Sequence, residues 1–153
     1  MKVFGVWDAE RSGVHLEQTV VPLRLASSTP DGCPLVVSLW FLWRDGALWC
    51  ATQRSSRVAS CIAREPRCGF EVAGDTPPYR GVRGQGRAEI VAERAEVILR
   101  ALLRRYRGTE DDPLGRRLLS RLDNEVAIRI APHWITSWDF TLRMSGGTRG
   151  DRG

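Results

Sequence analysis

A short polar stretch of the chain, "CATQRSSRV" at residues 50–58, gathers side chains that bind anions. Thr52, Ser55 and Ser56 carry hydroxyl groups, and Arg54 and Arg57 carry guanidinium groups. The stretch leads from a predicted strand into a predicted helix, whose first N–H groups have no partner within the helix. Arginine can hold a phosphate or a carboxylate with two parallel bonds. We therefore expect an anion site here, although the residues alone also fit an ordinary serine cap beside two solvated arginines.

The remainder of the chain offers few groups for catalysis. Lys2 is the only lysine, which excludes a P-loop, and His15 and His133 are the only candidates for a histidine base. If the protein is an enzyme, we expect a bound cofactor to carry the reaction. No metal site is expected either, because no C-x-x-C pair occurs among the cysteines, which are Cys33, Cys50, Cys61 and Cys68.

Length and composition indicate one globular domain. The chain has 153 residues, of which 42% are hydrophobic and 27% charged. The longest apolar run, residues 34–43, is too short for a membrane span, and the N-terminus lacks a signal-peptide pattern, so we expect a cytoplasmic protein with no membrane partner. We expect the domain to cover residues 1–142 and a disordered, Gly-rich basic tail to cover residues 143–153. The tail holds +2 of the net charge of +5. The remaining domain is only mildly basic, so no nucleic-acid partner is expected.

Hydrophobic periodicity predicts a mainly β, α+β fold. Residues 93–107 have an apolar helical stripe, and Asp112 with Pro113 begins a further short helix with its stripe at Leu114, Leu118 and Leu122. A helix capped by Ser55 or Ser56 is expected to run to Arg64. Together these elements describe a small six-stranded antiparallel barrel decorated with helices. Strands are predicted at residues 20–27, 35–43, 47–52, 67–74, 82–92 and 125–144, the last with a break near Pro132.

Two of these strands have features that suggest contact with a ligand or a partner. The strand at 35–43 is apolar on both faces, so both faces need cover, and Trp40 and Trp43 are expected on opposite faces. The strand at 82–92 and the residue just before it contain Gly81, Gly84 and Gly86. Glycines in a strand allow a ligand or another backbone to approach closely.

The order of several segments resembles the pyridoxamine 5′-phosphate oxidase-like family. The segments are "DGCPLVVSLWFLW", "DGALWCATQRSSR", "REPRCGFEV", "YRGVRGQGRAEIV" and "ITSWDF". The resemblance covers residues 20 to 140 and implies a split β-barrel of the FMN-binding type, which acts as a homodimer with cofactor at the interface. It further implies a flavin-dependent oxidoreductase that transfers a hydride to or from a small organic substrate, with FMN as the cofactor. The 8-hydroxy-5-deazaflavin coenzyme is the alternative cofactor, and a protein that holds flavin, haem or another tetrapyrrole without turnover is the alternative function.

The resemblance also implies which residues hold the cofactor. The strand at 35–43 would line the ring, the end of the next strand with the following helix start would hold the phosphate, and Trp138 would reach the ring from the second subunit. The implied cofactor-binding residues are Val37, Ser38, Leu39, Trp40, Ala51, Thr52, Arg54, Ser55, Ser56, Arg57, Gly81 and Trp138.

The chain departs from the family pattern at three of its positions. Many members have a lysine where this chain has Val58, and Arg54 is the candidate to replace that cation. Pyridoxamine phosphate oxidases themselves have an arginine near Val37 and a glutamine near Gly81. We therefore do not expect pyridoxamine phosphate oxidase activity.

Overall fold

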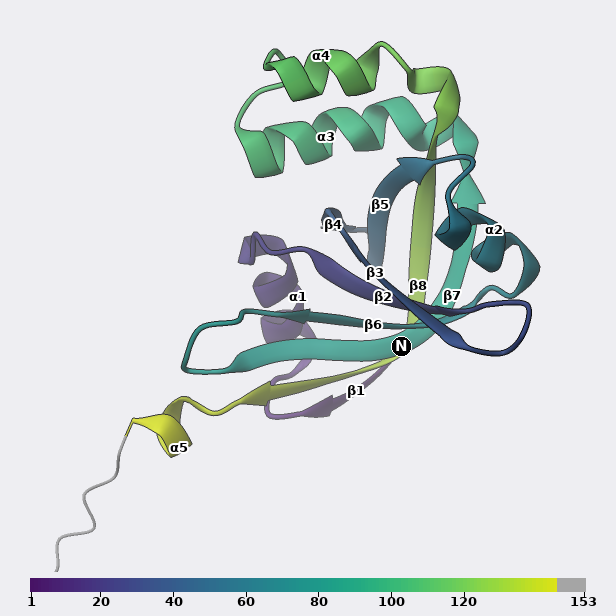
Figure 1. Cartoon of the computed structure of the whole chain (residues 1–153). Coiled ribbons are helices and arrows are strands. Elements are labelled where there is room, and N and C mark those ends of the chain that lie inside the picture. Colours follow the sequence, from purple (N-terminus) through teal and green to yellow (C-terminus); the bar gives the residue numbers. More distant parts are fainter. Residues whose placement is uncertain (146–153) are drawn as a thin grey trace, which may run out of the picture.

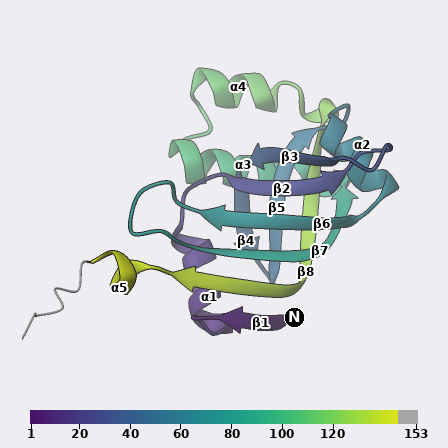
Figure 2. The same ribbon diagram turned by 60° about the horizontal axis from the view of Figure 1, so that its bottom comes forward.

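The computed structural model describes residues 1–145, which form one curled sheet and several helices. The strand order is β3-β2-β6-β7-β8-β5-β4, with all neighbours antiparallel, and β1 adds to β8 as a parallel strand. Figure 2 shows the row from β3 to β1 stacked in this order. The strands are β1 (Lys2–Gly5), β2 (Leu23–Ser28), β3 (Pro34–Leu39), β4 (Phe41–Arg44), β5 (Ala47–Gln53), β6 (Arg67–Ala73), β7 (Arg80–Val91) and β8 (Glu125–Asp139).

The helices lie around the curled sheet (Figure 1), with α3 and α4 together beside the ends of β5 and β8. Each of three helix starts has a side-chain cap, from Asp8, Ser56 and Asp112, and Gly108 ends α3 in the left-handed conformation. None of the helices within residues 1–145 combines the length and the apolar character that a membrane crossing needs. The helices are α1 (Ala9–Gln18), α2 (Arg57–Arg64), α3 (Ala95–Arg107), α4 (Pro113–Leu119) and α5 (Thr141–Met144), with short 3₁₀ turns at Ala92–Arg94 and Leu122–Asn124.

The predicted fold class is confirmed as an α+β fold with a curled, mostly antiparallel sheet, but the predicted number of six strands is wrong. The described residues contain eight strands. One additional strand, β1, precedes the first predicted strand and was not anticipated, because it is largely exposed and has no alternating apolar pattern. The other arises because the predicted strand at 35–43 divides at Trp40 into β3 and β4, which lie at opposite ends of the strand order.

The division at Trp40 has a visible cause in the hydrogen bonding. β3 pairs with β2, whereas β4 pairs with β5. Between them, the backbone N–H of Phe41 donates to the hydroxyl of Tyr106 on α3 at 3.2 Å, rather than to another strand. A side chain from the helix thus takes the place of a strand partner where the chain crosses from one pairing to the other.

Buried hydrophobic residues form two separate cores. The first fills the curl of the sheet and includes Leu25, Phe41, Ile128 and Ile130, all fully buried. The second lies under α3, where Ile98 and Leu102 pack on β4, β5 and β8. Strand β5 is buried from Ala47 to Cys50. It is apolar on both faces because it borders both cores.

The last two long strands hold the sheet together. β7 and β8 pair over most of their length, with a register shift at Gln85 and Gly86, opposite the region around Pro132. The predicted break near Pro132 is therefore a bulge within one continuous strand. α5 extends helical structure to Met144, two residues into the predicted tail, and the rest of that prediction, from residue 146, lies outside the described residues.

Candidate functional site

A cleft of about 320 Å³ lies where α3 and α4 cover the ends of β3 and β5. We call it the helix-covered cleft. Its volume falls in the range of small-molecule sites. The residues that line it are Ser38, Leu39 and Trp40 at the end of β3, Ala51, Thr52 and Gln53 of β5, Leu99 and Leu102 of α3, Leu118 of α4, and Glu125 of β8.

The cleft brings together two segments that sequence analysis assigned to one cofactor. Ser38, Leu39 and Trp40 come from the predicted ring strand, and Ala51 and Thr52 from the predicted phosphate strand. They meet because β3 and β4 diverge at Trp40, so that the end of β3 lies across from the end of β5. The predicted residue Val37, in contrast, packs against the first core, on the opposite face of β3 from Ser38.

Trp40 is held in position by Tyr106. The two rings stack with centroids 5.0 Å apart and an angle of 7° between planes. The Tyr106 hydroxyl donates to the carbonyl of Val21 at 2.8 Å and accepts from the Phe41 N–H. Burial raises the pKa of Tyr106, so the phenol stays protonated and keeps donating at ordinary pH. Because the Tyr106 hydroxyl bonds to two backbone groups, the ring that stacks on Trp40 is fixed. Trp40 therefore gives the cleft a rigid aromatic wall.

Glu125 places a carboxyl group in the same cleft. The residue is 5% exposed, and within residues 1–145 its carboxyl has no hydrogen bond and no ion pair. Burial raises its pKa. A carboxyl with little access to solvent and no protein partner is costly to ionise. Because Glu125 borders the cleft, a hydroxyl or N–H group of a ligand could supply the missing partner.

A second cavity of about 360 Å³ continues from the cleft, and we call it the arginine cavity. The two share Gln53, Leu118 and Glu125. The other lining residues are polar: Ser55, Arg117, Arg121 and Asn124. The combined space is therefore apolar at the Trp40 end and polar, with two guanidinium groups, at the Ser55 end.

The predicted anion residues divide between this cavity and the start of α2. Ser55 lines the arginine cavity. Ser56 is the N-cap of α2 and accepts a hydrogen bond from the Ala59 N–H at 3.2 Å. Arg54 and Arg57 are exposed and, within the part of the chain that the structure describes, form no ion pair. Neither arginine lines the helix-covered cleft or the arginine cavity, so whether they reach a ligand there stays a prediction.

Val58 occupies the position where many family members have a lysine. It is 4% exposed and belongs to the first core. The side chain at this position points into the barrel, so the valine contributes packing in this chain. The Arg54 N–H donates to the carbonyl of Asn124 at 2.6 Å, which ties the end of β5 to the start of β8.

The last two predicted residues, Gly81 and Trp138, lie far from the cleft along β8. They pair with each other across β7 and β8, and a Cβ atom at Gly81 would come 2.7 Å from the Trp138 ring. Thr52 pairs with Val126, and from there to Trp138 the strand path is about 40 Å at about 3.3 Å per residue. Within one subunit, Trp138 is therefore not part of the helix-covered cleft.

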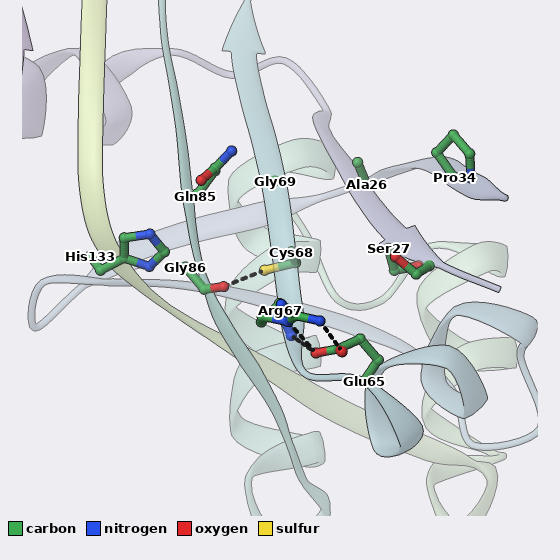
Figure 3. A pocket seen from close by; sticks show the side chains of 11 residues that line it. Ala26, Ser27, Pro34, Glu65, Arg67, Cys68, Gly69, Gln85, Gly86 and His133 are labelled. Atoms are coloured by element: carbon green, nitrogen blue, oxygen red, sulfur yellow. Dashed lines mark hydrogen bonds and ion pairs between the residues drawn. The ribbon is translucent and has the colours of Figure 1, made fainter. Parts of the chain in front are cut away.

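A larger hollow of about 420 Å³ lies on the outer face of the sheet, and we call it the sheet-face hollow (Figure 3). Its charged groups satisfy one another: Arg67 donates to both oxygens of Glu65, at 3.0 and 2.7 Å. The Cys68 thiol donates to the Gly86 carbonyl, and burial raises the pKa of Cys68 to about 11, which keeps it a thiol. Residues 1–145 contain no group of three or more side chains arranged to hold a metal ion. The lining residues are Ala26, Ser27, Ser28, Pro34, Glu65, Arg67, Cys68, Gly69, Gln85, Gly86 and His133.

Several lining residues were not identified as site residues from sequence. Leu99, Leu102 and Leu118 were predicted only as parts of helical stripes, and nothing in the sequence indicated that these stripes border a cleft. Glu125 and Arg121 follow a helix and precede a strand with no recognisable motif. The available signal was weak: an acidic residue at the start of a strand whose next three residues are apolar.

Comparison with known proteins identifies the family. The family model described as pyridoxamine 5′-phosphate oxidase matches residues 15–139. The chain therefore belongs to the pyridoxamine 5′-phosphate oxidase family, as the resemblance indicated. None of the curated proteins in the comparison matches the chain.

Solved structures give the same result for the fold. The conserved hypothetical protein Rv2991 from Mycobacterium tuberculosis is 29% identical, with a TM-score of 0.75, over 88% of this chain and 86% of that one. An F420 reductase is 24% identical, with a TM-score of 0.70, over 85% and 98% of the two chains. An FAD-binding protein from Mesorhizobium loti is 21% identical, with a TM-score of 0.63, over 86% and 93%. The last two comparisons bear on the fold alone.

Proposed function

We propose that the protein is an oxidoreductase that uses FMN, or the phosphate-bearing deazaflavin as the alternative, and binds it in the helix-covered cleft. The observation that carries the proposal is the meeting of Ser38, Leu39 and Trp40 with Ala51 and Thr52 in one cleft. These are the two segments that the family resemblance relates to the ring and to the phosphate. The printed names of an F420 reductase and an FAD-binding protein among the similar structures support this class of cofactor.

The residues of the cleft fit such a cofactor. Trp40, Leu99 and Leu102 offer apolar surface to a flat ring system. Glu125 offers an unpaired acceptor beside that surface. Ser55 and the helix start at Ser56 offer donors to a phosphate. When bound, the flavin would supply the hydride chemistry, and the protein would supply orientation and exclusion of water.

We further propose that the working unit is a homodimer. Trp138 lies at the far end of β8 from the cleft of its own subunit, so only a second copy could bring this side chain to the ring. Arg83 lies over the Trp138 ring at 5.3 Å, and a Cβ atom at Gly81 would come 2.7 Å from that ring, so the indole packs closely on β7. Binding of the cofactor should accordingly depend on dimerisation.

The test is reconstitution of the purified protein with FMN and, separately, with the deazaflavin coenzyme. Titration followed by tryptophan fluorescence should show saturable quenching, since Trp40 lines the cleft, and a Trp40→Phe variant should lose most of that signal. The absorbance spectrum of the complex identifies the cofactor: flavin gives two visible bands and deazaflavin one at shorter wavelength. Absence of binding to either compound at roughly 100 μM, about 5.5 kcal/mol of affinity, would exclude the proposal.

Binding without turnover is the second candidate, and one observation favours it. Glu125 is the one ionisable side chain that lines the helix-covered cleft, so the site holds few groups for proton transfer. Measurable electron transfer from NAD(P)H or a reduced cofactor to an acceptor would reject this candidate. Occupancy by cofactor without any such transfer would support it.

A further inference from the structure

We infer that Arg117 and Arg121 form the anion-binding arm of the cleft and hold the terminal phosphate of the ligand; both belong to the helical insertion, by which we mean α3, α4 and the turn that follows α4. This inference rests on the proposed function and extends it to residues that neither the family resemblance nor the comparisons assign. It starts from the two connected cavities. Any molecule that lies in both must pass Gln53, Leu118 and Glu125, the residues common to them.

The arginines of the two insertion helices fall into two groups. Several are neutralised by acidic neighbours: Arg100 and Arg104 pair with Glu110, and Arg116 pairs with Asp111. Arg117 on α4 and Arg121 in the turn after α4 form no ion pair within residues 1–145, and both line the arginine cavity. Two uncompensated guanidinium groups on one wall of a cavity raise the local positive potential, and a phosphate dianion is the group that this geometry suits best.

Neutral donors complete the site. Ser55 carries a hydroxyl group, and Gln53 and Asn124 carry amide groups, all facing the same cavity. This arrangement differs from the start of α2, where the Ser56 hydroxyl already accepts the Ala59 N–H and where Val58 is buried in the core. In the first turn of α2, Arg57 is the only positive charge. The insertion adds two more positive charges, Arg117 and Arg121.

Glu125 determines the direction in which the ligand lies. A phosphate placed against this buried carboxyl would be repelled, whereas hydroxyl groups could donate to it. The carboxyl stands at the junction of the two cavities. The ligand class that fits has an aromatic ring at Trp40, a polyhydroxylated chain past Glu125 and a phosphate monoester between Arg117 and Arg121.

The experiment compares FMN with riboflavin, which lacks the phosphate, in three proteins: wild type, Arg117→Ala/Arg121→Ala and Arg116→Ala. Arg116 is the matched control, because it lies on the same helix, is exposed and pairs with Asp111. In the double variant we expect the Kd for FMN to rise about 50-fold, while the Kd for riboflavin changes by less than about twofold. Arg116→Ala should leave both constants unchanged.

The possible outcomes separate this inference from the proposed function. If wild type binds FMN and the double variant binds it equally well, or if both ligands weaken alike, the two arginines do not hold the phosphate and the inference is overturned. If wild type binds no flavin, the proposed function fails, and calorimetric titration with inorganic pyrophosphate decides the inference. If wild type binds pyrophosphate and the double variant does not, the inference is supported. If wild type does not bind pyrophosphate, or if the double variant still binds it, the inference is overturned.

Discussion

The helix-covered cleft and the sheet-face hollow are both open cavities of similar size, yet they differ in how their polar groups are satisfied. In the hollow, Glu65 and Arg67 bond to each other and the Cys68 thiol bonds to a backbone carbonyl. In the cleft, the Glu125 carboxyl has no partner among residues 1–145 although it is 5% exposed. The charged groups of the larger hollow are therefore paired, although the buried Ser27 Oγ there has no hydrogen-bond partner, whereas the carboxyl of the cleft is an unpaired ionisable group.

The two regions also differ in their walls. The hollow has a floor of strand backbone with Gly69 and Gly86, and the cleft has leucines from two helices and a tryptophan fixed by Tyr106. A flat aromatic molecule gains more from the second kind of wall. The comparison indicates that an unpaired ionisable group and rigid apolar walls, rather than volume, distinguish the cleft from the hollow.

The largest effect should come from filling the cleft. Ser38 is exposed on β3 and lines the cleft, so Ser38→Trp should place an indole there at little cost to the fold. We expect at least a 100-fold loss of FMN affinity, about 2.7 kcal/mol, measured by fluorescence titration. His133→Ala in the sheet-face hollow is the control and should bind as wild type does. Loss of binding in His133→Ala with retention in Ser38→Trp would reverse the assignment of the two regions.

The next effect concerns the start of α2. Arg57→Ala should weaken FMN binding about tenfold, because one charge-assisted bond to phosphate is lost, and should leave riboflavin binding unchanged. Because Arg57 is exposed, the free energy of unfolding should change by less than about 0.5 kcal/mol, measured by urea denaturation. Arg87→Ala, at an exposed position on β7, is the matched control. Full FMN affinity in Arg57→Ala would remove Arg57 from the site.

A smaller effect on FMN binding is expected at the support of Trp40. Tyr106→Phe removes the donor to the Val21 carbonyl and the acceptor of the Phe41 N–H. We expect a loss of about 1–3 kcal/mol in the free energy of unfolding, since two backbone groups lose their partner, and a weaker FMN complex. Tyr79→Phe, an exposed position, should change neither quantity. If Tyr106→Phe binds FMN normally, Trp40 does not need the tyrosine for its orientation.

The smallest effect should appear at Glu125 and should depend on pH. Burial raises the pKa of Glu125 in the folded state, so the folded protein loses stability as pH rises through that raised value and incurs no penalty below the unfolded pKa. Glu125→Gln should therefore stabilise the ligand-free protein by about 1 kcal/mol at pH 7 and not at pH 4. Denaturation at both values measures this, with Asp123→Asn, at an exposed neighbouring position, as the control. An equal gain at both pH values would show that the carboxyl charge is not the cause.

Local sequence signals predicted much of the fold. The capping serine and the stripe of Val58, Cys61 and Ile62 are sufficient to indicate α2, and alternation or continuous apolar runs indicate most of the strands. The missed β1 is a short, exposed strand whose existence depends on pairing with the end of β8. The division of residues 35–43 coincides with a hydrogen bond from the Phe41 N–H to the Tyr106 hydroxyl of α3, which no local pattern records.

The candidate site was predictable only in part, for the same reason. Thr52 and Ser55 were identified because a strand leading into a helix start is a recognisable local pattern. Arg117 and Glu125 are brought to the site by the packing of α4 beside the start of β8, which is a tertiary feature. Val37 was assigned to the cofactor from its strand, but the pleat turns this residue toward the core and Ser38 toward the cleft.

A crystal structure of the protein grown with FMN tests the central claim most directly. We predict the ring against Trp40 and Leu102, with the phosphate beside Ser55 and the guanidinium groups of Arg117 and Arg121. Density for FMN in the sheet-face hollow between Gln85 and Glu65, with the helix-covered cleft filled only by water, would contradict it.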